Sequence, residues 1–209
     1  MAAFPKQLFV TGTDTEVGKT LVAAMLVAGL DGYYWKPVQS GTDEGTDSAW
    51  IQAKTGLPSK RFLPEAYRLR GFLSPHAAAA LENVEIHLSG IRKPALAATE
   101  YLVMEGAGGL MVPLGNRWLM VDLIKQLAAP VLLVARSGLG TINHTLLSLE
   151  KLKASGIDVF GVVMNGPRND DNRKAIEHFG KVRVLAQIEP MEAIDAEALK
   201  AVFMKHFGA

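Results

Sequence analysis

Short apolar runs alternate with helical patterns along most of this chain. The apolar, β-rich runs are strand-sized and lie at 7–10, 33–35, 101–104, 131–134, 159–164 and 182–185. The clearest helical patterns between them lie at 20–30, 121–128, 141–154 and 173–179. Repeated strand–helix–strand order predicts a mostly parallel sheet with helices packed on its faces, and near-continuous apolar strands indicate that both faces are buried. We therefore expect an α/β fold.

One segment has no readable pattern. Residues 56–73 carry charges and prolines with little periodicity, and we expect loops and a short helix there rather than a second domain. No linker, low-complexity tract or internal repeat divides the chain. The prediction is a single domain over residues 1–209.

Composition excludes several kinds of partner and site. Hydrophobic residues make up 49% and charged residues 21%, and the net charge is +1 from 22 basic and 21 acidic residues. This balance favours no nucleic-acid partner. The absence of cysteine excludes disulfides, thiolate metal sites and a cysteine nucleophile. Residues 1–6 carry no secretory signal and the apolar runs are too short to span a bilayer, so we expect a cytoplasmic protein without a membrane segment.

Unusual polar and glycine-rich segments follow five of the predicted strands. These segments lie at 12–20, 36–41, 105–109, 137–143 and 165–168. Ligands of parallel sheets bind at the carboxyl ends of the strands. We expect the five segments to lie at that edge of the sheet and to form one site.

The first of these segments has the pattern of a phosphate-binding loop. The sequence TGTDTEVGKT, residues 11–20, follows a strand and opens a helix. The standard pattern begins with glycine, whereas this chain has Thr13 in that place and Gly12 one residue earlier. Threonine fits there only if the backbone takes an ordinary conformation. A chance Gly-Lys-Thr in a strand-to-helix turn is the alternative interpretation.

The loop offers three kinds of nucleotide contact. Lys19 is expected on the β- and γ-phosphate oxygens, and the Thr20 hydroxyl is expected to ligate Mg²⁺. Backbone N–H groups of the loop and of the helix start are expected to cradle the phosphates. The loop residues assigned to this binding site are Glu16, Val17 and Gly18.

The sequence disfavours two other classes of P-loop protein. Partition ATPases of the MinD and ParA type carry Lys-Gly-Gly before Val-Gly-Lys-Thr, where this chain has Asp14, Thr15 and Glu16. GTPases need an Asn-Lys-x-Asp guanine reader, and residues 165–168 read Asn-Gly-Pro-Arg. ATP is therefore favoured over GTP as the co-substrate.

Taken together, the motifs resemble those of the dethiobiotin synthetases. The matching blocks are 11–20, KPVQSG at 36–41, Asp47 in an acidic stretch, SPH at 74–76, EGAGG at 105–109 and GLGTINH at 138–144. The resemblance implies a three-layer P-loop NTPase fold. It also implies closure of a cyclic urea from diaminopelargonic acid and carbon dioxide, through a carbamate and a carbamic–phosphoric anhydride, with ATP hydrolysed to ADP and phosphate.

The resemblance implies a magnesium site of hard oxygen ligands from Thr20, Asp47 and Glu105. Glu105 directly follows an apolar strand, which places it at the sheet edge. Asp47 is preferred because it precedes the helical pattern at 48–51, and a helix-capping role is its alternative. The other acidic candidates in that stretch are Asp43 and Glu44.

By the same resemblance, Lys36, Lys19 and Thr15 are the catalytic candidates. Lys36 corresponds to the lysine that binds the carbamate and the transferring phosphate, and a solvated lysine after a strand is the alternative. Thr15 and Glu16 are expected to contact the substrate amines, the carbamate or the nucleotide, and the sequence leaves these roles open. Ser40 is expected to bind substrate, with a turn serine as its alternative.

Two further segments are assigned by resemblance. Gly140, Thr141 and Asn143 begin a helix whose free N–H groups are expected to bind the substrate carboxylate across the interface of a homodimer. Asn165 resembles the residue that reads adenine. The remaining residues assigned to the nucleotide are Gly106, Ala107, Gly108 and Gly166.

The sequence disfavours two other functions. A cobyrinic-acid-type amide synthetase normally carries a glutaminase domain with a catalytic cysteine, and this chain has no cysteine. A nucleotide switch of the MinD or ParA type predicts a signature lysine, or a membrane-binding or DNA-binding face. The sequence shows neither feature.

Overall fold

The computed structural model describes residues 4–208. Its strands are β1 (Gln7–Gly12), β2 (Tyr33–Trp35), β3 (Val38–Gln39), β4 (Phe62–Leu63), β5 (Tyr67–Arg68), β6 (Leu102–Gly109), β7 (Val131–Arg136), β8 (Val159–Asn165) and β9 (Val184–Ile188). Its α-helices are α1 (Lys19–Leu30), α2 (Asp47–Thr55), α3 (Pro75–Leu81), α4 (Met120–Leu127), α5 (Thr141–Ala154), α6 (Asp170–Gly180) and α7 (Ala196–Phe207). Short 3₁₀ turns lie at Thr42–Glu44, Ser59–Arg61 and Leu88–Gly90.

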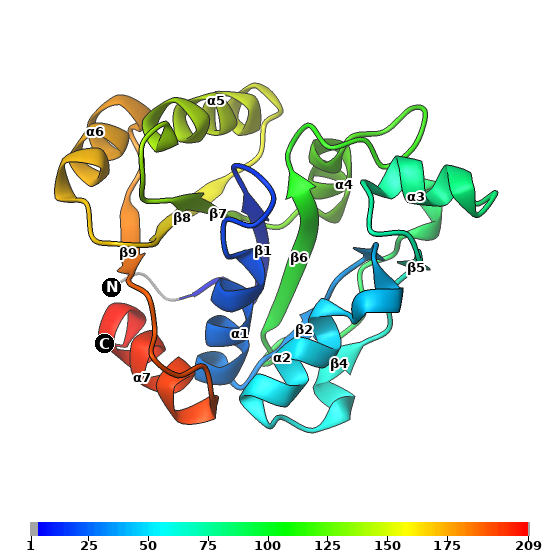
Figure 1. Cartoon of the computed structure of the whole chain (residues 1–209), viewed down its shortest axis with the longest axis horizontal. Helices are drawn as coiled ribbons and strands as arrows, with labels where there is room; N and C mark the ends of the chain where they lie inside the picture. Colours follow the sequence, from blue (N-terminus) through cyan, green and yellow to red (C-terminus); the bar gives the residue numbers. More distant parts are fainter. Residues whose placement is uncertain (1–3, 209) are drawn as a thin grey trace.

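A seven-stranded sheet forms the centre of the structure (Figure 1). The strand order is β4-β2-β6-β1-β7-β8-β9, and every neighbouring pair is parallel. A separate pair, β3 and β5, is also parallel. The predicted α/β fold with a mostly parallel sheet is confirmed.

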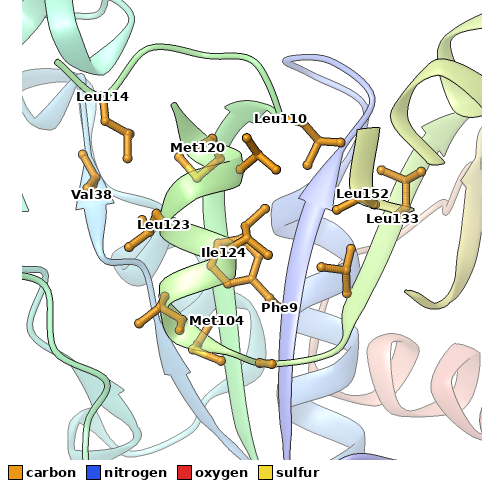
Figure 2. Close-up of a cluster of buried hydrophobic side chains, with 14 of the residues drawn as sticks. Phe9, Val38, Met104, Leu110, Leu114, Met120, Leu123, Ile124, Leu133 and Leu152 are labelled. Carbon is orange, nitrogen blue, oxygen red and sulfur yellow. The ribbon is translucent and has the colours of Figure 1, made fainter. Parts of the chain in front are cut away.

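Helices cover both faces of this sheet. Along β1, Phe9 points into the cluster covered by α4 and α5, while Leu8 and Val10 point into the cluster covered by α1 and α7. This alternation follows from the two-residue period of a strand. In Figure 2, Leu123 and Ile124 of α4 lie over the β1 and β6 side chains of the first cluster. The three-layer arrangement expected of a P-loop NTPase fold is therefore present.

Several predicted boundaries were wrong. β6 extends to Gly109 instead of ending at 104, because its ladder with β1 continues to the pair formed by Gly12 and Gly109. The last strand covers Val184–Ile188 rather than 182–185, because its ladder with β8 begins at Val184. Residues 56–73 hold two short strands as well as a 3₁₀ turn, since β4 pairs with β2 and β5 with β3.

The α7 helix is absent from the sequence prediction although its signal is present. The Asp195 side chain accepts a hydrogen bond from the Ala198 N–H and caps the helix. Leu199, Phe203 and Phe207 follow at intervals of four residues and pack against the central sheet. Among residues 4–208, no helix is long and apolar enough to cross a membrane.

Candidate active site

The five segments lie toward the carboxyl ends of parallel strands, although 105–109 is part of β6 rather than a loop after it. They do not all line one cavity. Residues of the phosphate loop, of 36–41 and of β6 share a cavity of about 880 Å³. The cavity is also lined by residues of the α2 start and by Phe72–Pro75. Gly140, Thr141 and Asn143 are not among its lining residues. Among the predicted site residues, Thr15, Glu16, Gly18, Lys19, Thr20, Lys36, Ser40, Asp47, Ala107 and Gly108 line the cavity.

The phosphate loop has the backbone that its unusual sequence requires. Among residues 4–208, the non-glycine residues with positive φ are Glu16, Asp31, Asn83, Ala128 and Lys181. Thr13 therefore has an ordinary conformation, as its place in the pattern demands. Gly18 has φ 97°, and a Cβ there would collide with the side-chain amide of Asn165. Glycine is needed at position 18 for both reasons.

Lys19 is held across its own loop. Its Nζ donates a hydrogen bond of 2.9 Å to the Asp14 carbonyl oxygen, and the residue is buried. Burial lowers the pKa of Lys19, and nearby Glu105 opposes that effect. Asp14 is fixed in turn, because its carboxylate accepts from the Thr15 N–H at 2.8 Å and pairs with Arg136 at 2.9 Å.

The centre of the site is a compact charged cluster, which consists of Thr20, Lys36, Asp47 and Glu105. The Thr20 hydroxyl lies 3.1 Å from Asp47 Oδ1 and 2.9 Å from Glu105 Oε1. Lys36 Nζ donates to Asp47 Oδ2 and, at 3.3 Å, to Glu105 Oε1. Side chains from α1, α2, β6 and the end of β2 therefore meet at one point.

The charges of this cluster are mutually compensated. Burial by itself lowers the pKa of Lys36, but the charges of Glu105 and Asp47 and their hydrogen bonds outweigh it and raise that pKa. Lys36 is thus held as an ammonium group between two carboxylates. A buried charge is stable in a protein only when it is paired in this way.

Two residues that the sequence analysis missed support the cluster. The Tyr34 hydroxyl donates to Glu105 Oε2 at 2.9 Å, and burial first, then Glu105, raises the pKa of Tyr34 well above its usual range. The Asp47 N–H donates to Gln39 Oε1 at 3.1 Å. A signal existed for Tyr34, because it stands two residues before Lys36 and so projects to the same side of the extended chain.

The residues of the cluster fit a magnesium ion. Two carboxylates and a hydroxyl converge beside a phosphate loop, and hard oxygens of this kind are the ligands that Mg²⁺ takes together with phosphates and water. Within residues 4–208 there is no group of three or more His, Cys, Asp and Glu residues placed to hold a metal. The expected set Thr20, Asp47 and Glu105 contains only two such residues. Asp47 is not the helix cap, since Thr46 caps α2 by accepting from the Ala49 N–H.

Ser40 and Thr15 are two hydroxyl residues predicted to bind substrate. Both line the cavity. Within the described residues, Ser40 Oγ is buried and has no hydrogen-bond partner. A buried hydroxyl without a partner costs free energy, which a bound polar ligand would recover.

Asn165 and its neighbours lie on the other side of the phosphate loop. Asn165 Nδ2 donates to the Val17 carbonyl oxygen at 3.1 Å, so the end of β8 is fastened to the loop. The Gly166 N–H donates to the Ile188 carbonyl oxygen at 2.8 Å and thereby places the end of β9 next to it. Gly106 is buried within β6, where a Cβ would lie 3.0 Å from Phe9 Cε1.

The start of α5 is largely exposed, apart from Thr141. Gly140 has φ 87° and precedes the helix, while Thr141 is buried and donates to the Arg136 carbonyl oxygen at 2.5 Å. Asn143 is exposed, and Leu139 and Leu147 are 102% and 62% exposed. Asn143 and Leu147 are four residues apart within α5, so they lie on one side of the helix, and Leu139 lies in the segment just before it.

Comparisons with known proteins decide the family. A family model described as an AAA domain matches residues 6–198. Over 192 residues the chain is 50% identical to the ATP-dependent dethiobiotin synthetase BioD of Paramagnetospirillum magneticum, covering 92% of each chain. The chain belongs to the dethiobiotin synthetase family. It is therefore an ATP-dependent ligase, and the resemblance inferred from the motifs is confirmed.

Two further comparisons complete the assignment. The chain is 54% identical over 196 residues to the biotin biosynthesis bifunctional protein BioCD of Bordetella avium, covering 93% of this chain and 42% of that protein. The chain thus spans less than half the length of this relative. The structure of the McdA–ATP complex from Cyanothece has a TM-score of 0.55 at 13% identity, covering 99% of this chain and 92% of that one. At that identity the likeness concerns the fold alone.

Proposed function

We propose that this chain closes the ureido ring of dethiobiotin from diaminopelargonic acid and carbon dioxide, with ATP as co-substrate and Mg²⁺ as cofactor. The observation that carries the proposal is that Lys19, Thr20, Lys36 and Asp47 line one cavity beside a phosphate loop, while buried Glu105 contacts Thr20 and Lys36 from beneath it. A nucleotide switch of the ParA type and an amide synthetase of the cobyrinic acid type are disfavoured by the family to which the chain belongs.

The proposed reaction has three covalent steps. One amine of the substrate adds to carbon dioxide, loses a proton and becomes a carbamate. A carbamate oxygen attacks the γ-phosphorus, and the bond from that phosphorus to the ADP oxygen breaks. The second amine then attacks the carbonyl carbon of the anhydride and loses a proton, while phosphate leaves with the bonding electrons. The products are dethiobiotin, ADP and phosphate.

The side chains contribute position and fixed positive charge rather than covalent chemistry. In this proposal Lys19 holds the β- and γ-phosphate oxygens, and Lys36 holds the carbamate and the transferring phosphate. Both lysines line the cavity on which the phosphate loop opens. Mg²⁺, when bound by Thr20, Asp47 and Glu105, neutralises charge on the phosphate oxygens. Charge that is already in place when the transition state forms lowers its energy most.

The rest of the nucleotide is assigned to the far side of the loop. Glu16, Val17 and Gly18 present their backbone to the phosphates, since this part of the loop precedes the free N–H groups of α1. Asn165 is assigned to adenine. Its Nδ2 donates to the Val17 carbonyl oxygen, so this side chain lies against the phosphate loop.

The substrate is assigned to two surfaces. Thr15 and Ser40 contact its amines and carbamate from within the cavity, and the Ser40 hydroxyl, which has no partner within residues 4–208, supports this role. The start of α5 in a second copy of the chain binds its carboxylate, with Gly140, Thr141 and Asn143 as the contact residues. The exposed apolar side chains Leu139 and Leu147, which flank Asn143, support a homodimer through this part of the surface.

A single assay tests the proposed reaction. The purified chain is incubated with ATP, Mg²⁺, bicarbonate and diaminopelargonic acid, and both phosphate release and dethiobiotin are measured. We expect both products in equal amounts, and little phosphate when the diamine is omitted. Phosphate release that is equally fast without the diamine would favour a nucleotide switch and contradict the proposal. Phosphate without dethiobiotin would indicate a different acceptor.

A further inference from the structure

Glu105 is held by a tyrosine that belongs to none of the predicted motifs. The Tyr34 hydroxyl donates to Glu105 Oε2 over 2.9 Å, and the two residues are only 0% and 1% exposed. The ring of Tyr34 packs in the core between the sheet and α1, and it contacts Phe62 with ring centroids 6.1 Å apart. Both partners of this hydrogen bond are therefore fixed in place by packing.

The two oxygens of Glu105 have different partners. Oε2 accepts from Tyr34, whereas Oε1 accepts from Thr20 at 2.9 Å and from Lys36 at 3.3 Å. The last torsion of a glutamate is broad, so a carboxylate without a fixed donor readily turns its oxygens. The Tyr34 hydroxyl is a rigid donor on Oε2, and it therefore fixes Oε1 as the oxygen that faces Thr20 and Asp47.

We propose that Tyr34 is a positioning residue that orients Glu105 for metal binding. Its hydroxyl satisfies the oxygen that points away from the cation, and it thereby directs Oε1 toward the site shared with Thr20 and Asp47. The inference rests on the magnesium site of the proposed function. Partners that orient metal ligands typically change metal affinity or activity by roughly 10–100-fold.

The test removes the hydroxyl and keeps the ring. In Tyr34→Phe we expect the dissociation constant for Mn²⁺, measured by electron paramagnetic resonance in the presence of ADP, to rise roughly tenfold or more. The KM for Mg²⁺ rises with it. Tyr33→Phe is the matched control, because Tyr33 is the preceding residue of the same strand and packs against the opposite cluster. Its metal affinity is expected to equal that of the unmodified protein.

A double-mutant cycle with Glu105→Gln shows whether Tyr34 acts through Glu105. In the Glu105→Gln background, we expect Tyr34→Phe to change the dissociation constant for Mn²⁺ by less than about twofold, because the group that Tyr34 positions has lost its charge. An equal loss in both backgrounds contradicts the proposal, since Tyr34 would then act elsewhere.

A second variant and the metal binding of the unmodified protein also test the role of Tyr34. Tyr34→Met provides a second protein without the hydroxyl should Tyr34→Phe fail to fold, and an unchanged dissociation constant in either folded variant overturns the inference. An unmodified protein that binds no Mn²⁺ with ADP rejects the metal site itself, and with it this inference. Tight metal binding without dethiobiotin formation would reject the proposed reaction alone.

Discussion

The charged cluster and the start of α5 are the two halves of the proposed site, and they are built in opposite ways. In the charged cluster, Lys36 and Glu105 are 5% and 1% exposed, and every member has a partner within the same chain. At the start of α5, Leu139 is fully exposed and Asn143 faces solvent. The region proposed to bind phosphate is therefore held together within one chain, whereas the region proposed to bind the carboxylate lies on the exposed surface.

This difference has a physical basis. Buried charges must be paired, so the four elements that carry the charged cluster have to be fixed by the fold before any ligand arrives. A helix start needs no such pairing, because water satisfies its exposed N–H groups. The comparison implies that changes in the charged cluster alter chemistry and folding together, while changes on α5 alter association and substrate binding only.

The largest expected effect comes from removing the positive charge of the cluster. Lys36→Gln should lower kcat roughly 10²–10³-fold, the usual effect of deleting one group that stabilises transition-state charge. Turnover is followed by phosphate release, and ATP binding is measured separately by calorimetry. Lys60→Gln, at an exposed position, is the control. A kcat for Lys36→Gln within threefold of normal, on the order of 0.6 kcal/mol, would remove Lys36 from the mechanism.

The second effect tests the other half of the site. Leu147→Asp places a charge on the exposed side of α5, and we expect a dimer to dissociate to a monomer in sedimentation analysis. The KM for the diamine should rise roughly 10–100-fold, the equivalent of losing hydrogen bonds to a charged carboxylate, while the KM for ATP stays unchanged. Met204→Asp on α7 is the matched control, at 59% exposure against 62% for Leu147. If the unmodified protein is a monomer at concentrations at which it turns over the diamine, a site shared between two copies is contradicted.

A smaller effect is expected where the cavity meets the substrate. Ser40→Ala removes a hydroxyl that has no partner among the described residues, so folding stability should stay the same or improve slightly. The KM for the diamine should rise about fivefold, corresponding to roughly 1 kcal/mol for one hydrogen bond. Thermal unfolding and steady-state kinetics check the two parts. A loss of stability together with an unchanged KM would make Ser40 a turn residue only.

The smallest effect concerns pH. The pKa of Lys36 is raised above its ordinary value of 10.5, so its contribution to stability is fully present below that value and is lost as pH rises through the folded-state pKa. Without metal, the difference in melting temperature between the unmodified protein and Lys36→Met should stay constant from about pH 7 to about pH 9. It should shrink above the unfolded-state pKa. If the difference in melting temperature grows as the pH becomes more alkaline, the pKa of Lys36 is lowered in the folded protein instead.

The sequence by itself determined the parallel α/β order, the phosphate loop and the residue types of the site. Strands and helices with strong periodicity were predicted because their apolar patterns are local. The same is true of the Gly-Lys-Thr turn, whose chemistry is contained in ten consecutive residues. Motif order then pointed to the family, which the comparisons confirmed.

Only the tertiary structure decided which of these residues touch. Glu105 meets Thr20 and Tyr34 from 85 and 71 residues away in the sequence, and no local pattern records such a pairing. The short strands β3, β4 and β5 likewise exist because they pair with distant partners, not because of their own composition. Burial and charge pairing are properties of the packed chain, and for that reason the hydrogen bond of Tyr34 to Glu105 became visible only there.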